Sequence, residues 1–398
     1  MRVLILQYSG DYRAAVRSLA KGGSDTYYAQ KYSVDAVAAL VPQVEAVTVL
    51  CCTMSEPYNE VLENGVCAIG GGFSGQIPAD ALIALIAAQN PTHLIVQFPM
   101  RPVFKWAIKH KVKTIAVLAE SIVTKSLRAK LRGYRLVGLL NHKQIEWVGS
   151  YGVTASLALQ SLGVKADKII PWDFLITTEP SSLPPKLLRQ DLDSWNLIYV
   201  GSMILEKGVS DILEAVAMMR SLNQPVTLTV IGNDTTGFFA EQAKQLAIAD
   251  HVKFYGIVAT SMIEPLMREA DVVLVPSHHE YPEGFPLVIH HALCARTPLI
   301  ASDHPMFRLH LQHGVNALIV PAKNPGALAA SVERLMTDPS LYLKLSQAAH
   351  STWHRLRLPV KWADVIYNWL FDSERNQQWF MQHCLSSERY SSTKELLL

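Results

Sequence analysis

The sequence predicts an α/β protein with two domains, whose parallel sheets face each other across a cleft. Its 398 residues are more than a single hydrophobic core usually supports. Strand-like and helix-like segments alternate in both halves, which is typical of βαβ units and parallel sheets. Residues 178–194 interrupt the alternation with three prolines and several serines, so we interpret them as a linker. A cleft between linked domains is a favoured ligand site, and its closure would exclude water.

The first domain is expected over residues 1–177. Short apolar runs indicate its strands, and longer segments of helical periodicity indicate its helices. The predicted strands are 3–7, 46–51, 93–98, 114–119 and 168–171. The predicted helices are 24–40, which Gly22 and Gly23 would open, and 79–88, 103–110 and 153–162.

The second domain is expected over residues 195–350. Its predicted strands are 196–200, 226–231, 252–255, 271–275, 299–301 and 317–320. Its predicted helices are 208–222, 238–248, 262–269, 287–295 and 326–336. The tail, 351–398, is helical in pattern as far as residue 384 and rich in aromatic residues. We therefore expect it to pack on a domain and to cross back to the first one.

The composition excludes several classes of protein. Apolar residues make up 49% of the chain and charged residues 18%, which indicates well-filled cores rather than disorder. The net charge of +2 makes no case for nucleic acid. Five cysteines without a C-x-x-C motif indicate a reducing compartment. The start MRVLILQYSGD is expected to be a strand rather than a signal peptide, and no apolar run is long enough to cross a bilayer. We expect a cytoplasmic protein.

Lys207 is the first candidate for chemistry. The strand 196–200 is followed by a turn containing Gly201, and Lys207-Gly208 then begins a helix. The C-terminal ends of strands in an open α/β sheet are where ligands bind. A solvated lysine at a helix start is the alternative, but a helix N-terminus disfavours a cation. We therefore favour a role for Lys207 in binding an anion such as a departing diphosphate. A P-loop is excluded, because G-x-x-x-x-G-K-[ST] is absent.

Glu283 is the second candidate. It follows the strand 271–275 and precedes a helix that Gly284 opens, so a carboxylate and an anion-binding helix N-terminus lie together. A carboxylate accepts hydrogen bonds from several hydroxyls, so phosphate and polyol recognition in one pocket indicates a nucleotide sugar. An acidic residue at a helix start is also favourable for the helix dipole alone, and Glu280 competes for the same role. Ser277 and the segment 301–305 support the binding interpretation.

Several short motifs occur in a characteristic order. They are Gly201-x-x-x-x-x-Lys207-Gly208, Val230-Ile231-Gly232, Phe254-Tyr255-Gly256, Pro276-Ser277, Glu283-Gly284-Phe285, Ala292, Pro298, Ala301 and Gly314-x-Asn316-Ala317-Leu318-x-Val320-Pro321. From Gly201 to Pro321 this order resembles the C-terminal domain of family 4 retaining glycosyltransferases. Those enzymes have the GT-B fold, in which two Rossmann-like domains face each other. The first half resembles their acceptor domain less closely.

The resemblance implies a hexosyltransferase of glycan biosynthesis that moves a sugar from a nucleotide-diphosphate sugar to a hydroxyl acceptor with retention. It implies no metal and no cofactor beyond the donor co-substrate. Lys207 and Glu283 would act in catalysis, and Glu120 lies near the place of a family histidine. The implied donor-binding residues are Gly22, Gly23, Gly201, Ser202, Ser277, Gly284, Phe285 and His291. The acceptor would be a glycan, a lipid-linked molecule or a small molecule.

The sequence departs from the family pattern at several positions. The family has a second glutamate eight positions after the first, where this chain has His291. An arginine that often follows the glycine at 201 is replaced by Ser202, and an asparagine-glycine pair is replaced by Pro171-Trp172. These departures motivate an alternative: a weakly active or inactive homologue that binds a sugar nucleotide or a protein. A dinucleotide-dependent oxidoreductase is disfavoured, because no G-x-G-x-x-G follows the first strand.

Paired histidines and a basic segment are two further patterns in the sequence. His278-His279 and His290-His291 form adjacent pairs, but neighbouring helix residues point about 100° apart, which opposes a shared metal ion. Residues 101–135 are strongly basic, with Leu127, Leu131 and Tyr134 between the cations at helical spacing. This segment would either form a solvated helix face or contact an anionic membrane or a phosphorylated acceptor. A peripheral contact with the inner face of a membrane therefore stays open.

Overall fold

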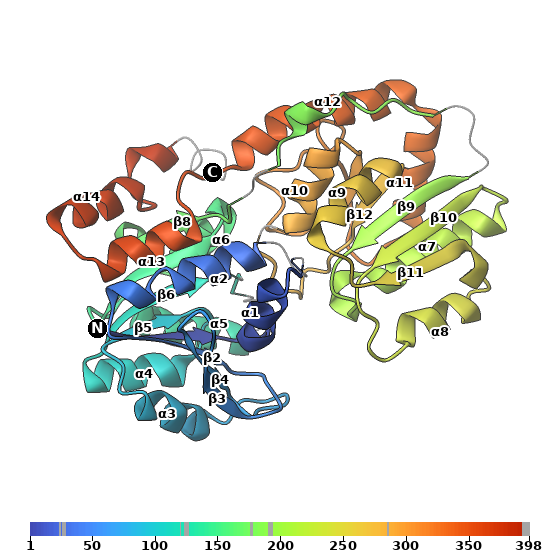
Figure 1. The fold of residues 1–398 in the computed structure, drawn as a ribbon. Coiled ribbons are helices and arrows are strands. Elements are labelled where there is room, and N and C mark those ends of the chain that lie inside the picture. The colour runs from blue at the N-terminus through green and yellow to red at the C-terminus, as the bar shows by residue number, and fades with distance from the viewer. Residues whose placement is uncertain are drawn as a thin grey trace. The chain divides into compact units, whose positions relative to one another are not determined.

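The structure is a computed structural model that describes residues 1–23, 25, 29–119, 121–122, 127–175, 178–189, 194–284 and 286–391. The chain forms two compact units (Figure 1). Unit 1 contains the described residues of Met1–Asp25, Ala29–Leu175 and Leu358–Leu398. Unit 2 contains those of Ile176–Arg357. No helix among the described residues is long and apolar enough to cross a membrane.

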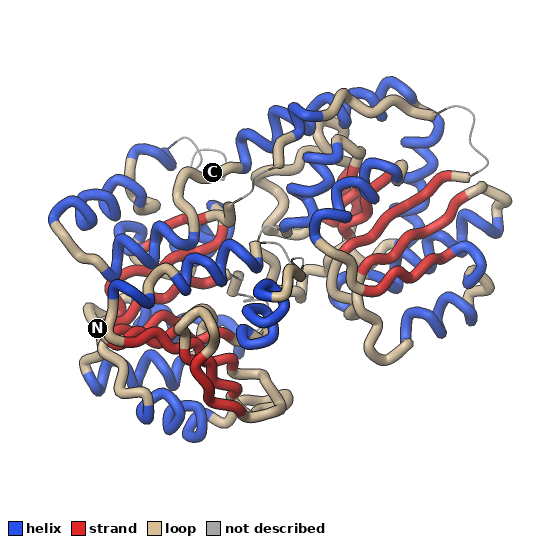
Figure 2. The backbone as a smooth tube through the Cα atoms, in the orientation of Figure 1, coloured by secondary structure: helices blue, strands red, loops and turns tan. Residues whose placement is uncertain are grey.

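Unit 1 is built on an eight-stranded sheet in the order β3-β4-β2-β1-β5-β6-β7-β8 (Figure 2). The strands are β1 (Arg2–Gln7), β2 (Ala46–Cys51), β3 (Tyr58–Val61), β4 (Cys67–Gly70), β5 (His93–Val96), β6 (Lys113–Leu118), β7 (Ile145–Tyr151) and β8 (Ile169–Trp172). All neighbours pair in parallel except β3 and β4, which form an antiparallel edge. The central strands are buried on both faces, as expected for a parallel sheet covered by helices.

The helices of unit 1 cover both faces of this sheet. They are α1 (Tyr12–Ala20), α2 (Gln30–Ala38), α3 (Ala79–Ala88), α4 (Arg101–His110), α5 (Leu127–Leu140), α6 (Val153–Ser161), α13 (Trp362–Leu370) and α14 (Glu374–His383). In Figure 1, α3 and α4 lie on one side of the sheet, and α2 and α13 lie on the other. Helix α4 contacts α5, so these two helices form neighbouring parts of one layer.

The C-terminal tail belongs to unit 1 from Leu358 onward. Asp173 after β8 forms a β-bridge with Lys361, just before α13. The indole of Trp369 on α13 donates to Glu146 of β7 at 2.8 Å. These contacts attach α13 to the β7–β8 edge of the sheet, although α13 lies about 200 residues later in the sequence. The unit boundary falls between Arg357 and Leu358, a few residues after the expected bound at 350.

Unit 2 is built on a six-stranded parallel sheet in the order β11-β10-β9-β12-β13-β14. Its strands are β9 (Trp195–Val200), β10 (Val226–Ile231), β11 (Val252–Gly256), β12 (Val272–Val275), β13 (Leu299–Ser302) and β14 (Leu318–Val320). Its longer helices are α7 (Val209–Ser221), α8 (Phe238–Gln245), α9 (Thr260–Glu269), α10 (Leu287–Ala295), α11 (Pro325–Thr337) and α12 (Pro339–Leu356). Right-handed crossovers place α7 and α8 on one face and α9 and α10 on the other. The predicted fold class, two α/β domains with parallel sheets, is confirmed.

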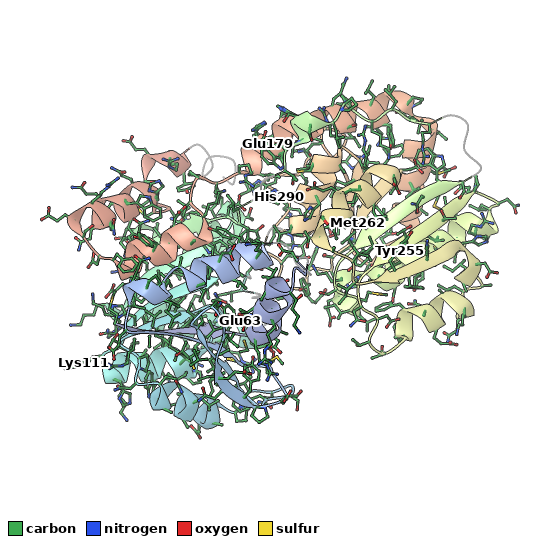
Figure 3. The ribbon with its side chains drawn as sticks, viewed as in Figure 1. Glu63, Lys111, Glu179, Tyr255, Met262 and His290 are labelled. Atoms are coloured by element: carbon green, nitrogen blue, oxygen red, sulfur yellow. The ribbon has the colours of Figure 1, made fainter. Side chains whose placement is uncertain are left out.

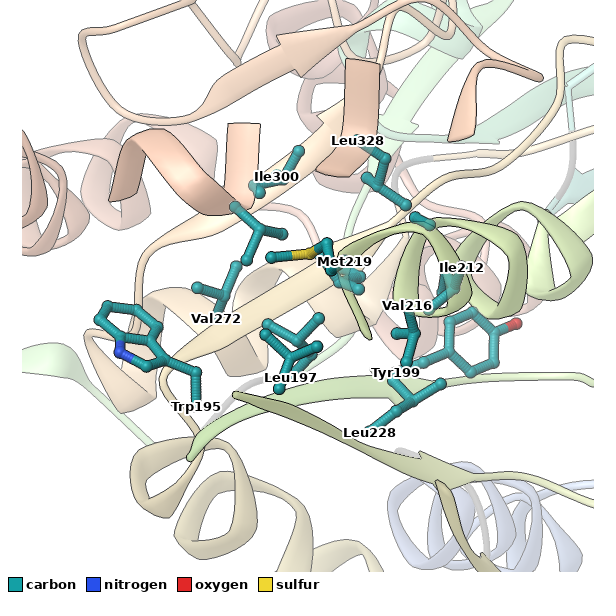
Figure 4. Close-up of a cluster of buried hydrophobic side chains, with 14 of the residues drawn as sticks. Trp195, Leu197, Tyr199, Ile212, Val216, Met219, Leu228, Val272, Ile300 and Leu328 are labelled. Atoms are coloured by element: carbon teal, nitrogen blue, oxygen red, sulfur yellow. The ribbon is translucent and has the colours of Figure 1, made fainter. Parts of the chain in front are cut away.

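A continuous apolar core joins α7 and α11 to the sheet of unit 2 (Figure 4). Leu197 of β9, Ile212 of α7 and Leu228 of β10 are at most 1% exposed. Each such side chain contributes roughly 1.5–3 kcal/mol when it is fully buried. This packing fixes the strands at whose C-terminal ends Lys207 and Glu283 lie.

The structure differs from the expected organisation at several places. Gly22 and Gly23 do not open a helix: they end α1, which Asp11 begins by accepting a hydrogen bond from the amide of Ala14. Gly22 has φ +78°, a left-handed conformation that suits the residue after a helix. The prediction also missed the β3–β4 hairpin and β7. The described part of the predicted linker, 178–189, packs on unit 2, where the backbone amide of Lys186 donates to Ser346 on α12.

Candidate functional site

The candidate site lies at the C-terminal edge of the unit 2 sheet. Strands β9 and β12 pair in parallel, so the segments that follow them meet at one edge. After β9 comes a short 3-10 helix, Leu205–Lys207, which leads into α7. After β12 comes the loop 276–284, which leads into α10. We refer to residues 276–284 as the acidic loop, because it carries Glu280 and Glu283.

Lys207 and Glu283 form an ion pair at this edge. The ammonium nitrogen of Lys207 lies 2.6 Å from Oε1 of Glu283, and their side chains are 14% and 6% exposed. The hydroxyl of Ser277 donates to the same oxygen at 2.7 Å. The ammonium also lies 4.1 Å from the centre of the Tyr281 ring. Oε1 therefore accepts two hydrogen bonds, while Oε2 accepts no hydrogen bond from the described part of the chain.

Gly208 explains how the two segments approach so closely. A Cβ atom at this position would lie 2.5 Å from the carbonyl oxygen of Pro276, and Gly208 has φ +75°. A side chain there would clash with backbone and strain the left-handed conformation. The glycine thus allows the start of α7 to lie against the start of the acidic loop.

His278 ties the acidic loop to the segment that carries Lys207. Its backbone amide donates to the carbonyl of Glu206 at 2.8 Å. Its ring atom Nε2 lies 2.7 Å from Oδ2 of Asp211, in the first turn of α7. His278 and Asp211 are 13% and 15% exposed, so water competes little for this bond. His278 thus contacts Glu206 and Asp211, which lie before and after Lys207 in the sequence.

Two more histidines hold the loop to the neighbouring strands. His279 Nε2 lies 2.7 Å from Oδ1 of Asp303, which also accepts from the amide of Ala322 at 3.0 Å. Burial acts to raise the pKa of Asp303, but these hydrogen bonds outweigh it and lower the pKa. His304 accepts at Nδ1 from the amide of Met306 and donates from Nε2 to the carbonyl of Tyr281. Burial lowers the pKa of His304, which favours this neutral form.

His291 lies on α10 and pairs with an acid that the sequence did not reveal. Its Nδ1 atom lies 3.0 Å from Oε1 of Glu264, on the neighbouring helix α9. Figure 3 marks these two helices by Met262 and His290. The hydroxyl of Thr178 donates to the same carboxylate oxygen at 2.6 Å. Burial would raise the pKa of Glu264, but the bonds from His291 and Thr178 hold it below its ordinary value.

The remaining predicted site residues are placed as follows. Gly201 and Ser202 follow β9, and the carbonyl of Ser202 accepts a hydrogen bond from the hydroxyl of Tyr199 at 2.8 Å. Gly284 directly follows Glu283, and Gly22 and Gly23 lie in unit 1 after α1. Glu120 and Phe285 lie outside the described residues. The structure thus brings Lys207, Ser277 and Glu283 into direct contact, and it bonds His291 to Glu264 instead.

The two histidine pairs lie in different elements, His278 and His279 in the acidic loop and His290 and His291 on α10. His278, His279 and His291 bond to three different acids: Asp211, Asp303 and Glu264 respectively. Within the described ranges, no three His, Cys, Asp or Glu side chains are grouped so as to hold a metal ion. The histidines of the acidic loop are therefore structural contacts between its backbone and the sheet edge.

Sequence reasoning missed Asp211 and Glu264, and it named Asp303 only as part of the segment 301–305. Asp211 lies a few residues after the motif glycine Gly208, so a search for acids near the strand ends would have found it. Glu264 gives no such signal. It is separated by 27 residues from His291 and meets it only because α9 packs on α10.

Comparisons with known proteins find relatives for most of unit 2. Residues 186–352 match the glycosyl transferases group 1 family. A glycogen synthase of Mycobacterium tuberculosis is 29% identical over 170 residues, which is 42% of this chain and 40% of that protein. A phosphatidyl-myo-inositol mannosyltransferase of Mycolicibacterium smegmatis is 29% identical over 160 residues, 40% of each chain. The matched part thus spans well under two thirds of these curated relatives.

Solved structures are similar over most of both units. Sucrose-phosphate synthase of Thermosynechococcus elongatus has a TM-score of 0.65 at 18% identity and covers 93% of this chain and 99% of its own. Anabaena HepE in complex with UDP and glucose has a TM-score of 0.61 at 15% identity, covering 89% and 95%. At sequence identities this low, the structural similarity shows a shared fold and nothing more. The chain has the GT-B fold, and its residues 186–352 are similar to the glycosyl transferases group 1 family.

Proposed function

We propose that this protein transfers a sugar, a hexose in the first instance, from a nucleotide-diphosphate sugar to a hydroxyl acceptor with retention of anomeric configuration. The observation that carries the proposal is the Lys207–Glu283 pair at 2.6 Å, at the ligand-binding edge of a group 1 domain. A cation for the diphosphate and a carboxylate for sugar hydroxyls are the two functions that such a donor needs.

The pair is arranged so that a donor can use both partners. Lys207 and Ser277 hold Oε1 of Glu283, which leaves Oε2 to accept from a sugar hydroxyl. A diphosphate drawn to the Lys207 ammonium would lie beside the N-terminus of α7, whose amide groups add to the positive potential. Gly284, with Phe285, would supply amides at the N-terminus of α10. The ammonium stabilises charge that develops on the leaving oxygen, so its contribution is greatest in the transition state.

The reaction balances without a base from the protein. The bond between the anomeric carbon and the diphosphate oxygen breaks, and the acceptor oxygen bonds to the same face of that carbon. The acceptor proton passes to an oxygen of the leaving diphosphate. This front-face course needs no metal, and it suits a site whose one buried carboxylate is already bonded to a lysine.

His291 is proposed to lie toward the nucleotide's ribose, together with Glu264. A single imidazole cannot accept hydrogen bonds from two adjacent hydroxyls as the two oxygens of a carboxylate can. Glu264 of the neighbouring helix lies 3.0 Å from His291, so it could supply a carboxylate beside the imidazole. A carboxylate there would compensate for the missing glutamate at position 291, which supports an active enzyme over an inactive homologue.

Turnover with a panel of UDP-, GDP- and ADP-sugars tests the proposal. UDP-glucose is the first choice, because HepE was solved with that molecule. The pure protein, with simple glycosides as acceptors, should release nucleoside diphosphate from one donor, and NMR of the product should show the donor's anomeric configuration. Lys207→Gln should lower kcat by about 100-fold or more, as the loss of an oxyanion donor does. Lys244→Gln, at an exposed lysine of α8, is the matched control.

The outcomes separate the two candidate functions. Release that Lys207→Gln leaves unchanged, or product of inverted configuration, would contradict the proposal. Tight nucleotide binding without release of nucleoside diphosphate from any sugar donor would favour the alternative of a binding module. The departures from the family pattern at Ser202 and His291 suggested that alternative.

A further inference from the structure

A cationic surface covers part of unit 1. Helix α4 and the start of β6 expose Lys105, Lys109, Lys111 and Lys113, and helix α5 exposes Arg132 and Arg135. Helices α4 and α5 contact each other, so the cations of both belong to one layer of the unit. Lys111 lies at the outer end of α4 (Figure 3). We call these six residues the basic surface.

The basic surface has no acidic residue of its own. The segments Arg101–His110, Lys113–Leu118 and Leu127–Leu140 contain no aspartate or glutamate. Within the part of the chain that the structure describes, none of the six cations takes part in an ion pair. Their charge is therefore unneutralised by the unit and available to an anionic partner.

Apolar side chains lie among these cations. Leu131 is 51% exposed and Tyr134 is 60% exposed, although α5 buries Leu136, Val137 and Leu140 on its other face. At about 100° per residue, Leu131, Tyr134 and Arg135 lie within one arc of the helix. The outer face of α5 thus presents an aliphatic and an aromatic side chain beside guanidinium groups.

We propose that this surface binds the surface of a membrane that contains anionic phospholipid. Cations are attracted to anionic headgroups, each by about fivefold in affinity, while Leu131 and Tyr134 can enter the headgroup boundary. Nucleic acid or a phosphorylated protein would use the charges but has little need for an exposed leucine. The combination of an acid-free basic helix layer with outward apolar residues favours a lipid surface. This proposal does not depend on the proposed transferase activity.

Sedimentation of the full chain with lipid vesicles tests it. Vesicles of phosphatidylcholine alone should bind little, and vesicles that also contain phosphatidylglycerol should bind the protein. R132E/R135E should weaken this binding by about 25-fold or more, on the scale of fivefold per cation. The matched control is R375E/R389E, which reverses two exposed arginines elsewhere in unit 1. A second variant, L131S/Y134S, keeps every charge and should lose the binding that remains at about 0.5 M salt, where charges are screened.

Each outcome decides the question. No binding to phosphatidylglycerol vesicles, or an equal loss in R375E/R389E, would overturn the proposal. So would binding to a soluble polyanion such as heparin that depends on Arg132 and Arg135 while vesicles do not bind, since that result indicates a phosphorylated or nucleic-acid partner. Circular dichroism of each variant excludes misfolding, and R132Q/R135Q provides a milder substitution if R132E/R135E does not fold.

Discussion

At the scale of single residues, Glu283 and Glu264 of unit 2 are held in different ways. Glu283 bonds to Lys207 and Ser277 through one oxygen, and it is 5% exposed. Removing one partner of such a pair leaves a buried charge uncompensated, which costs about 3–5 kcal/mol. Glu264 is held by His291 and Thr178, and its side chain is 20% exposed. The Lys207–Glu283 pair lies at the start of α7, whereas the His291–Glu264 pair joins α9 and α10.

The lowered pKa of Glu264 predicts an effect of pH on stability. A carboxyl whose folded pKa is below its ordinary value of 4.5 stabilises the fold above that pH, and this stability is lost as pH falls through the folded pKa. Glu264→Gln removes this titration and should lower the free energy of unfolding by about 1.5–3 kcal/mol near neutral pH. The difference between the two proteins should be smaller at an acid pH below 4.5 than near neutral pH, because the carboxyl becomes protonated.

Urea denaturation at both pH values measures that difference. The pKa values of Asp303 and Asp338 are also lowered, but both proteins contain these residues, so their contributions cancel. A difference that stays constant from neutral to acid pH would contradict the ionised state of Glu264 in the folded protein.

At the scale of elements, the acidic loop is the part on which the site depends most. Its position is set by bonds to two other segments: His278 contacts Asp211 of α7, and His279 and Tyr281 contact the adjacent residues Asp303 and His304. His278 bonds to Glu206 and Asp211, on either side of Lys207 in the sequence. It should therefore determine how closely the acidic loop lies to the start of α7. We therefore assign it a positioning role rather than contact with the donor.

His278→Ala should lower kcat/KM for the donor by about 10- to 100-fold, since a displacement of about 1 Å can cost that much. His278→Gln keeps a side-chain N–H donor for Asp211 and should recover part of the loss. His251→Ala, in the turn before β11, is the control for removing a histidine from unit 2. Steady-state kinetics with melting temperatures separate positioning from general instability. Equal losses in the Ala and Gln variants, or none in either, would argue against this role.

At the scale of the whole molecule, much of the fold is predictable because each strand and helix has its own local signal. Helix α10 was predicted with its observed bounds, 287–295, since Pro286 precedes it and an apolar run fills it. The β3–β4 hairpin was missed because its strands have four residues each and alternate weakly. Helix α1 was missed because its start depends on the side chain of Asp11.

The site was predictable only where a motif lies at a strand end. Lys207 and Glu283 were found in this way, and the structure brings them together. The contact between Glu264 and His291 was not predictable, because it depends on how two helices pack rather than on a local pattern. Long-range pairs of this kind follow from tertiary packing and leave no mark at fixed spacing in a sequence.

The most direct test of the central claim is the effect of Lys207 on nucleoside diphosphate binding, followed by thermal unfolding. At about 100 times Kd, a diphosphate should raise the melting temperature of the wild-type protein by about 5 °C or more. Lys207→Gln should abolish this rise. The double variant K207Q/E283Q, which leaves no unpaired buried charge, should fold normally and also show no rise. A full shift in both variants would show that Lys207 and Glu283 do not form the donor site.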